Sequence, residues 1–389
     1  MYWPMAKIAR KARAALCSTT PMSGVFILGD DLMVDSAQST ADVATQDEAD
    51  TPTVDARDSG GARSSRFVGT VLLLILIAMW IGGWYSGTST EEMLSLTAWG
   101  VMLGGIIALG GIGLTLCYGV LKFPNFAHGE FLTLGAYVTY GVILVLPKSN
   151  PIWLFSFGWE LVIGLLLSAV VTAIVAVVID RVLYRPLRKH QSPLVLLAMA
   201  SLGMEFLLRG IVYLIWGSDY HFYYSGRANP ALYLPFGLRL QADQLFVFAL
   251  AIVLVVMLYW MLTRTRIGKA MRATADNPDL AQVRGINTEQ VIAWTWSIGA
   301  GLAAIGGVMY GLASQMRPDM GFVLLLPIFA GVIMGGIGSA WGALVGSIII
   351  GVAMQLTSAF MNPAYGPAVA FILMVLVLLM RPQGLFAQH

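Results

Sequence analysis

A short stretch between two apolar segments carries three side chains able to interact with a polar solute. Asn125, His128 and Glu130 place an amide, an imidazole and a carboxylate within six residues. Pro124 ends the preceding helix, which leaves Asn125 in position to cap the next one. Ionisable groups at membrane depth are costly and usually functional, which favours a substrate path or gate. A structural cap and a hydrated turn at the interface explain the same residues equally well.

A second polar pair lies in the apolar segment 194–216. Glu205 and Arg209 are four residues apart, so both side chains lie on one face of a helix, where they can pair. Pairing is the least costly way to hold two charges in lipid. The pair is either a structural contact to a neighbouring helix or the polar lining of a translocation cavity.

Motifs for catalysis and for nucleotide hydrolysis are missing. The sequence has no P-loop pattern G-x-x-x-x-G-K-[ST] and no nucleophile–base pair. Its four His residues are isolated, and Cys17 and Cys117 do not have metal-ligand spacing. We therefore expect no enzyme activity, no cofactor and no metal site. A basic face with stacking aromatics is also missing, so nucleic acid is not an expected partner.

Membrane-spanning helices must position these side chains. The 389 residues are 58% hydrophobic and 11% charged, whereas soluble domains are about 45–50% apolar and about 25% charged. This favours an all-α, polytopic transmembrane bundle of about 8–10 spans. We expect the segments 131–146 and 322–337 to be tilted, re-entrant or broken, because they are short for a full span. The ten apolar segments are 68–85, 94–121, 131–146, 152–179, 194–216, 245–262, 291–314, 322–337, 342–360 and 366–380.

The N-terminal part differs in composition from the rest. Residues 1–66 are rich in acidic and small polar residues, which predicts a disordered cytosolic tail. A signal peptide, or a true start at Met22 or Met33, is the alternative. Residues 67–93 then form an additional span and a short loop, and residues 94–386 form the main membrane domain.

A polar, basic loop of about one helical hairpin's length occupies residues 263–290. Loop 180–190 is also basic, and two spans separate the two loops, so both lie on one side. The excess of Lys and Arg predicts that this side is cytoplasmic, as are both termini. Loop 217–244 is then external, either as an interfacial cap or as a landing surface for a partner. The length of loop 263–290 predicts a docking element.

Glycines spaced by four predict close helix packing in the last third of the chain. The residues assigned to this role are Gly335, Gly336, Gly338, Gly342 and Gly346.

Taken together, these features resemble the permease subunits of branched-chain amino acid ABC importers, with the urea and short-chain amide permeases as close relatives. The resemblance covers residues 94–386, and the tail and the span 68–85 lie outside it. Four stretches carry it, in this order: Asn125–Glu130; Arg264–Ala273 with Asn277-Pro278; Gly285–Asn287; and Gly335–Ser339 with Gly342, Gly346 and Gly351.

The resemblance implies a subunit of the cell membrane that forms half of the path for branched-chain or related amino acids. It also implies a second permease subunit, two ATPase subunits and an extracytoplasmic binding protein. In the family the ATPases grip a loop resembling E-A-A-x-x-x-G, and Asp279–Gly285 keeps this spacing with Asp for Glu and one Ala. The implied coupling residues are Asp276, Asn277, Asp279, Ala281, Gly285 and Ile286.

Two alternatives remain open at the level of sequence. A urea or amide permease has the same pattern. A self-contained secondary transporter or channel would need ion-coupling carboxylates in mid-membrane, and Glu205, already matched with Arg209, is the strongest candidate.

Overall fold

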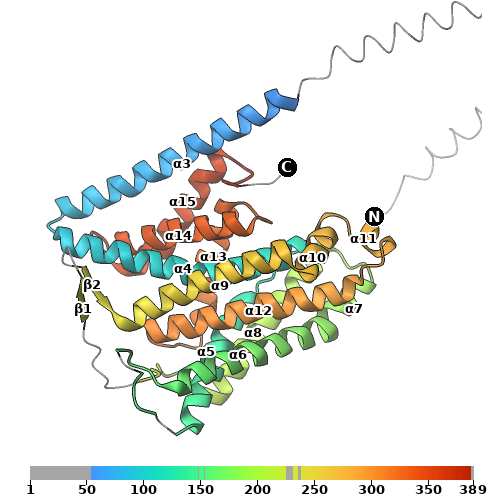
Figure 1. The fold of residues 1–389 in the computed structure, drawn as a ribbon, viewed down its shortest axis with the longest axis horizontal. Coiled ribbons are helices and arrows are strands. Elements are labelled where there is room, and N and C mark those ends of the chain that lie inside the picture. The colour runs from blue at the N-terminus through green and yellow to red at the C-terminus, as the bar shows by residue number, and fades with distance from the viewer. Residues whose placement is uncertain (1–53, 148, 153, 225–230, 235–237, 387–389) are drawn as a thin grey trace, which may run out of the picture. The chain divides into compact units, whose positions relative to one another are not determined.

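The structure, a computed structural model, describes residues 54–147, 149–152, 154–224, 231–234 and 238–386. Residues Gly61–His389 form one compact unit. In this unit apolar helices run side by side and one β hairpin lies at an end of the bundle (Figure 1). Within the described residues, eight helices are long and apolar enough to cross a membrane. The predicted class, an all-α polytopic bundle, is confirmed.

The helices follow the ten apolar segments closely. Their bounds are α3 Val54–Tyr85, α4 Thr90–Leu121, α5 His128–Val145, α6 Trp159–Ile179, α7 Arg185–Lys189, α8 Leu194–Trp216, α9 Ala242–Arg264, α10 Arg266–Asp276, α11 Pro278–Val283, α12 Thr288–Ala313, α13 Met320–Gly335, α14 Ala340–Thr357 and α15 Gly366–Met380. Strands β1 (Ala231–Leu234) and β2 (Leu238–Gln241) pair antiparallel. A π-helical turn, Asp180–Tyr184, joins α6 to α7.

The largest differences from the predicted boundaries are at the starts of α3 and α6. Helix α3 begins at Val54, so residues 54–66 are helical where a disordered tail was expected; residues 1–53 lie outside the described part. Helix α6 begins at Trp159 instead of residue 152. Residues before it form a turn in which Ile152 N donates to Phe157 O at 2.9 Å, and Phe157 packs on Phe246 of α9. Aromatic packing outside the helix therefore accounts for the apolar residues that suggested a longer span.

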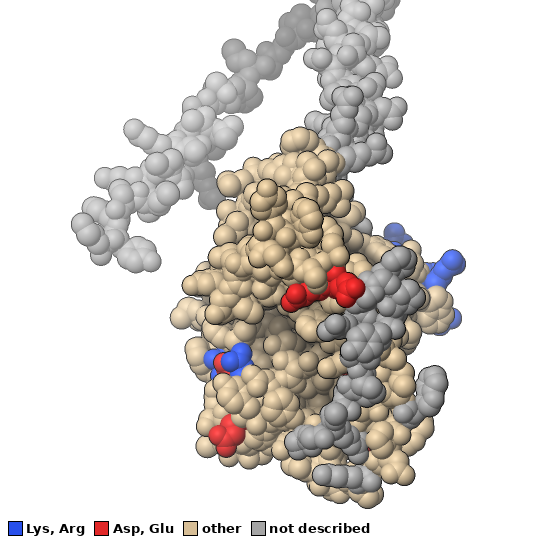
Figure 2. All heavy atoms as spheres, turned by 90° about the vertical axis from the view of Figure 1, so that its left-hand side faces the viewer, with Lys and Arg blue, Asp and Glu red and all other residues tan. Residues whose placement is uncertain are grey.

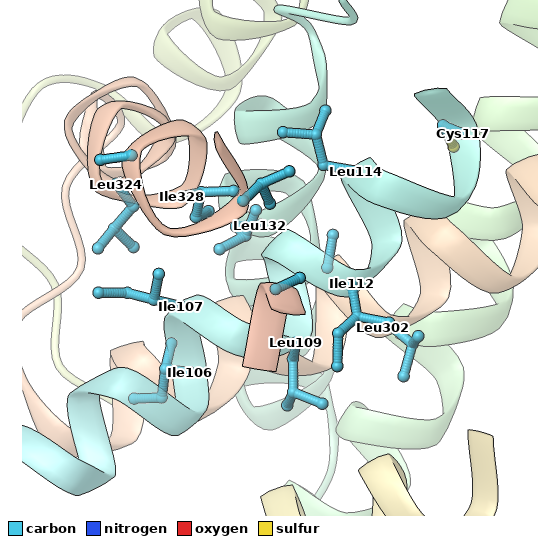
Figure 3. Close-up of a cluster of buried hydrophobic side chains, with 14 of the residues drawn as sticks. Ile106, Ile107, Leu109, Ile112, Leu114, Cys117, Leu132, Leu302, Leu324 and Ile328 are labelled. Atoms are coloured by element: carbon cyan, nitrogen blue, oxygen red, sulfur yellow. The ribbon is translucent and has the colours of Figure 1, made fainter. Parts of the chain in front are cut away.

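Helix α4 lies at the centre of the unit and packs most extensively against α14, with α12 and α13 also in contact. Figure 3 shows its apolar side chains facing Leu132 of α5, Leu302 of α12 and Ile328 of α13. All of these side chains are buried. The core therefore forms around a helix that is apolar on every side, as expected for a span enclosed by other spans.

The two short segments, α5 and α13, both begin inside the bundle. His128, the first residue of α5, contacts Gly110 of α4, which lies eleven residues before the end of α4 at Leu121. Gly321, at the start of α13, donates its N–H to Thr133 Oγ1 of α5 at 3.0 Å. The first turns of the two helices therefore lie side by side within the protein, where non-helical backbone is tolerated.

Glycines allow the central helices to approach at backbone distance. A Cβ on Gly335 would collide with the Gly342 carbonyl, and one on Gly346 with the Gly331 carbonyl. Gly336 backbone lies 2.7 Å from where a Cβ on Gly384 would be. Gly338 is an exception to the predicted packing role. A Cβ there would meet nothing within 4 Å, and its φ of +92° shows that it serves the turn between α13 and α14.

We expect Gly104→Ala to destabilise the fold, because its Cβ would lie 2.6 Å from Ile348 Cα in α14. The backbone of one helix must then shift, which costs about 1–3 kcal/mol. Gly203→Ala in α8 is the matched control, since a Cβ at Gly203 meets nothing within 4 Å. Thermal unfolding of the purified protein in detergent should show a lower midpoint for Gly104→Ala only. Equal midpoints would contradict the assigned α4–α14 contact.

The two basic loops lie at the same end of the unit. Arg185 of α7 forms an ion pair with Glu289, at the start of α12, with Nε and Oε2 2.9 Å apart. Figure 1 shows α7, α10 and α11 at this end and the β1–β2 hairpin at the other. The structure therefore confirms the prediction that the two basic loops lie on the same side.

Candidate functional site

A buried cluster of three charges joins α5 to α8. Arg209 Nε lies 3.0 Å from Glu130 Oε1, and Arg209 Nη2 also pairs with Glu205 Oε1. Both carboxylate side chains are 1% exposed, and the Arg209 side chain is 15% exposed. The guanidinium lies over the Phe322 ring of α13, 4.6 Å from its centroid. Two carboxylates therefore share one cation, and the cluster holds three helices together.

His128 and Asn125 are also buried, but their partners lie outside this cluster. His128 Nε2 lies 2.9 Å from the Gly110 carbonyl, and a carbonyl can only accept, so Nε2 carries the proton and donates. Asn125 does not cap α5, in contrast to the prediction. The N-cap is Ala127, and the Asn125 side chain instead accepts a hydrogen bond from the Tyr184 hydroxyl at 3.3 Å. The chain enters the bundle between Lys122 and Ala127, which turns Asn125 away from the helix start.

None of these five residues lines a described cavity. The largest, about 500 Å³, lies between α4, α9, α12, α13 and α14. Its polar lining comes from Gln241, Gln244, Gln355, Tyr310 and Ser314, and its apolar lining from Trp99, Met102, Leu103, Ile106, Ala313, Val323, Leu324, Pro327, Met354 and Pro363. A smaller cavity of about 260 Å³ shares Trp99, Met102 and Gln244 with it.

The cavity lies at the end opposite to the basic loops. Helix α12 begins beside those loops and ends at the cavity with Ala313. Its 26 residues span about 39 Å at 1.5 Å per residue. Figure 2 views the end that carries the β1–β2 hairpin and shows a hollow in it. One end of the unit therefore has a hollow with an apolar base and a polar rim. The other end has the helical loop at residues 263–290.

The loop at residues 263–290 folds into the two helices α10 and α11. Thr265 caps α10 by accepting from Gly268 N at 3.1 Å. Asn277 caps α11 by accepting from Leu280 N at 2.9 Å, and Pro278 follows at the first helical position. The basic residues of α10, Arg266, Lys269 and Arg272, are exposed. Local capping signals thus turn the loop into a hairpin of two short helices.

The predicted coupling residues lie on different faces of this hairpin. Asp276, Asn277 and Asp279 are exposed, Ile286 is half-buried, and Ala281 is buried. Gly285 is exposed with φ of +84°, which strains any other residue. Ala281 therefore packs the loop together and cannot touch a partner directly.

Three residues of the loops and helices described above were not predicted from the sequence: Leu280, Val283 and Tyr184. Leu280 and Val283 are 55% and 84% exposed on α11, although their surroundings in the sequence are polar. Apolar residues in a polar loop are the signal that identifies them. Tyr184 is fully buried and stacks on Trp296 of α12, with centroids 5.1 Å apart and planes at 10°. Its partner is more than a hundred residues away, so spacing does not reveal this contact.

An aromatic residue of the loop at residues 217–244 anchors the loop to α5. The Tyr223 hydroxyl donates to the Ala136 carbonyl at 3.0 Å, and burial raises the pKa of Tyr223 well above its usual range. His221 pairs with Met316 in an isolated bridge. The described part of the loop is thereby fixed to the bundle.

Comparison with known proteins identifies similar sequences over most of the chain. The family described as "Branched-chain amino acid transport system / permease component" matches residues 96–378. LivH of Escherichia coli (strain K12), a high-affinity branched-chain amino acid transport system permease, is 34% identical over 300 residues, covering 74% of this chain and 94% of the relative. BraD of Pseudomonas aeruginosa, named for the same kind of transport system, is 32% identical with the same coverage.

Proposed function

The chain belongs to the branched-chain amino acid transport system permease family, and we propose that it forms half of the translocation path of an ATP-driven branched-chain amino acid importer. Helix α11 is the observation that carries the proposal. It presents Leu280 and Val283 to solvent at the end opposite to the cavity. An apolar pair on a capped helix fits a groove in a protein partner, as amphipathic helices do.

The energy for transport comes from another chain in this proposal. The sequence has no P-loop motif, so ATP hydrolysis by that route belongs to partner subunits. The partners proposed are a second permease subunit, two ATPases and an extracytoplasmic binding protein. With the basic loops on the cytoplasmic side, α11 faces the ATPases and the cavity faces the binding protein. Both termini are then cytoplasmic.

The 500 Å³ cavity is the proposed entrance of the path. Its base is apolar, with Met102, Ile106 and Leu324 among its residues, and its rim carries Gln244 and Gln355. An apolar base suits a branched aliphatic side chain, and amides at the rim suit the polar backbone of an amino acid. The same apolar base is the observation that favours this substrate class over urea.

We expect Ser314→Trp to reduce import, because Ser314 lines the cavity. The loss should be roughly ten-fold or more, since an indole fills space that the solute needs. Gln315→Trp is the matched control, because Gln315 is exposed and does not line the cavity. Uptake of labelled leucine by membrane vesicles carrying equal amounts of each variant measures the effect. Similar losses of uptake in both variants would show that the cavity is not part of the translocation path.

Binding by the cognate extracytoplasmic protein tests the substrate class. Calorimetry with leucine, isoleucine, valine and urea should give tight binding for the branched-chain amino acids and none for urea. Tight binding of urea alone would replace the proposed substrate with the alternative, a urea permease.

A further inference from the structure

Helix α11 is fixed to the start of α12. Gln282 Nε2 of α11 donates to Thr288 Oγ1 at 2.9 Å, and Ile286 N donates to the Ala281 carbonyl at 3.0 Å. Ala281 is buried, so α11 has packing as well as hydrogen bonds on its inner side. A force on the outer side of α11 therefore reaches the first turn of α12.

The first turn of α12 is tied in turn to the π-helical turn at Asp180–Tyr184. Glu289 pairs with Arg185 at 2.9 Å, directly after the turn. Asp180 pairs with Arg188 of α7 at 2.6 Å, which fixes the start of the turn to the helix that follows. A π-helical turn adds a residue to the helical repeat and often occurs at functional sites. Here it places Tyr184 between Trp296 of α12 and Phe123.

Tyr184 contacts both α12, which is linked to α11, and the polar stretch that follows α4. Its ring stacks on Trp296 of α12 and lies 5.3 Å from the Phe123 ring. Its hydroxyl donates to Asn125 Oδ1, and Asn125 Nδ2 has no partner among the described residues. The segment from Phe123 to Ala127 leads directly into His128.

We propose that Tyr184 is a positioning residue that couples displacement of α11 to the non-helical segment Phe123–Ala127. Three contacts in series carry the displacement: α11 to α12, α12 through its Trp296 to Tyr184, and Tyr184 to Asn125. Densely packed aromatic rings transmit displacement because they cannot be compressed. The inference rests on the proposed function, since it presumes that partner subunits push on α11.

Two hydroxyl deletions separate coupling from core packing. Tyr184→Phe keeps the ring and removes the hydrogen bond to Asn125. Tyr137→Phe is the matched control, because Tyr137 is also fully buried and its hydroxyl has no partner among the described residues. Both variants are placed in the complete transporter, with its second permease, ATPases and binding protein, in liposomes. The measured quantity is leucine imported per ATP hydrolysed.

Tyr184→Phe is expected to lower this ratio roughly three- to ten-fold, the range for loss of one buried hydrogen bond, with the complex still assembled. Tyr137→Phe should keep the ratio of the unaltered complex. Asn125→Ala combined with Tyr184→Phe should be no worse than the more severe single variant, because both changes break one contact. That non-additivity distinguishes coupling from two separate packing effects.

An unchanged ratio in Tyr184→Phe would overturn the inference, and so would a failure of this variant to assemble, since the hydroxyl would then serve folding. Additive losses in the double variant would overturn it as well. Failure of the unaltered complete transporter to import leucine has a different meaning, because it contradicts the proposed function itself.

Discussion

Replacing both Leu280 and Val283 by aspartate is expected to abolish ATPase binding while the membrane bundle stays folded. The two side chains are three residues apart on α11, so they share one face. The side chains of Leu280 and Val283 are 55% and 84% exposed, so the change removes little packing within the chain. Burying a Leu and a Val in a partner groove contributes about 4 kcal/mol, or roughly a thousand-fold in affinity. Co-purification of the ATPases with the tagged permease measures the loss.

The control for this change introduces an acid on the neighbouring helix. Lys269→Asp alters an exposed residue of α10 without touching the apolar pair, and it should leave co-purification close to that of the unaltered protein. Ala281→Arg is unsuited to the purpose, because Ala281 is buried and its replacement would disturb the hairpin. Undiminished ATPase binding by the Leu280/Val283 double variant would exclude α11 as the docking element.

Removal of Arg209 is expected to destabilise the bundle strongly. Arg209→Leu leaves Glu130 and Glu205, each 1% exposed, without their shared cation. Breaking a buried pair by removing one partner typically costs about 3–5 kcal/mol. Because the Arg209 side chain is 15% exposed, the lower value of about 3 kcal/mol applies here. The midpoint of thermal unfolding in detergent should fall by roughly 5 °C.

Removing one of the two carboxylates of the cluster, instead of the arginine, is the control. Glu205→Gln removes one of two carboxylates and leaves Arg209 paired with Glu130 alone, so its midpoint should stay within roughly 2 °C. The expected order is therefore a severe effect for the arginine and a mild one for the glutamate. A severe effect of Glu205→Gln, or none of Arg209→Leu, would show that the three charges do not act as one cluster.

Local periodicity predicted the helices and one ion pair because both depend on near neighbours. Glu205 and Arg209 share a helix face, so their spacing revealed the pair. Glu130, the third member, lies 79 residues from Arg209, and no local pattern links them. Asn125 shows the limit most clearly. Its position after Pro124 predicted a helix cap, but the chain turns into the bundle and brings the side chain to Tyr184.

The cavity also could not be predicted from the sequence. Gln355 lies within an apolar segment and Gln241 ends a strand, so neither belongs to a motif. They meet at one rim only because α9 begins, and α14 ends, at the same end of the bundle. By contrast, the loop at residues 263–290 was visible in the sequence as a polar, basic run between apolar segments. Its helix caps, Thr265 and Asn277, are seen in the structure. Only the folded structure shows which side of α11 faces solvent.

Reconstitution into liposomes tests the central claim most directly. The complete complex, with ATP enclosed and loaded binding protein outside, should take up labelled leucine, and omission of the ATPase subunits should abolish the uptake. Leucine uptake by this chain alone, without ATPase subunits, would contradict the account and favour a self-contained transporter.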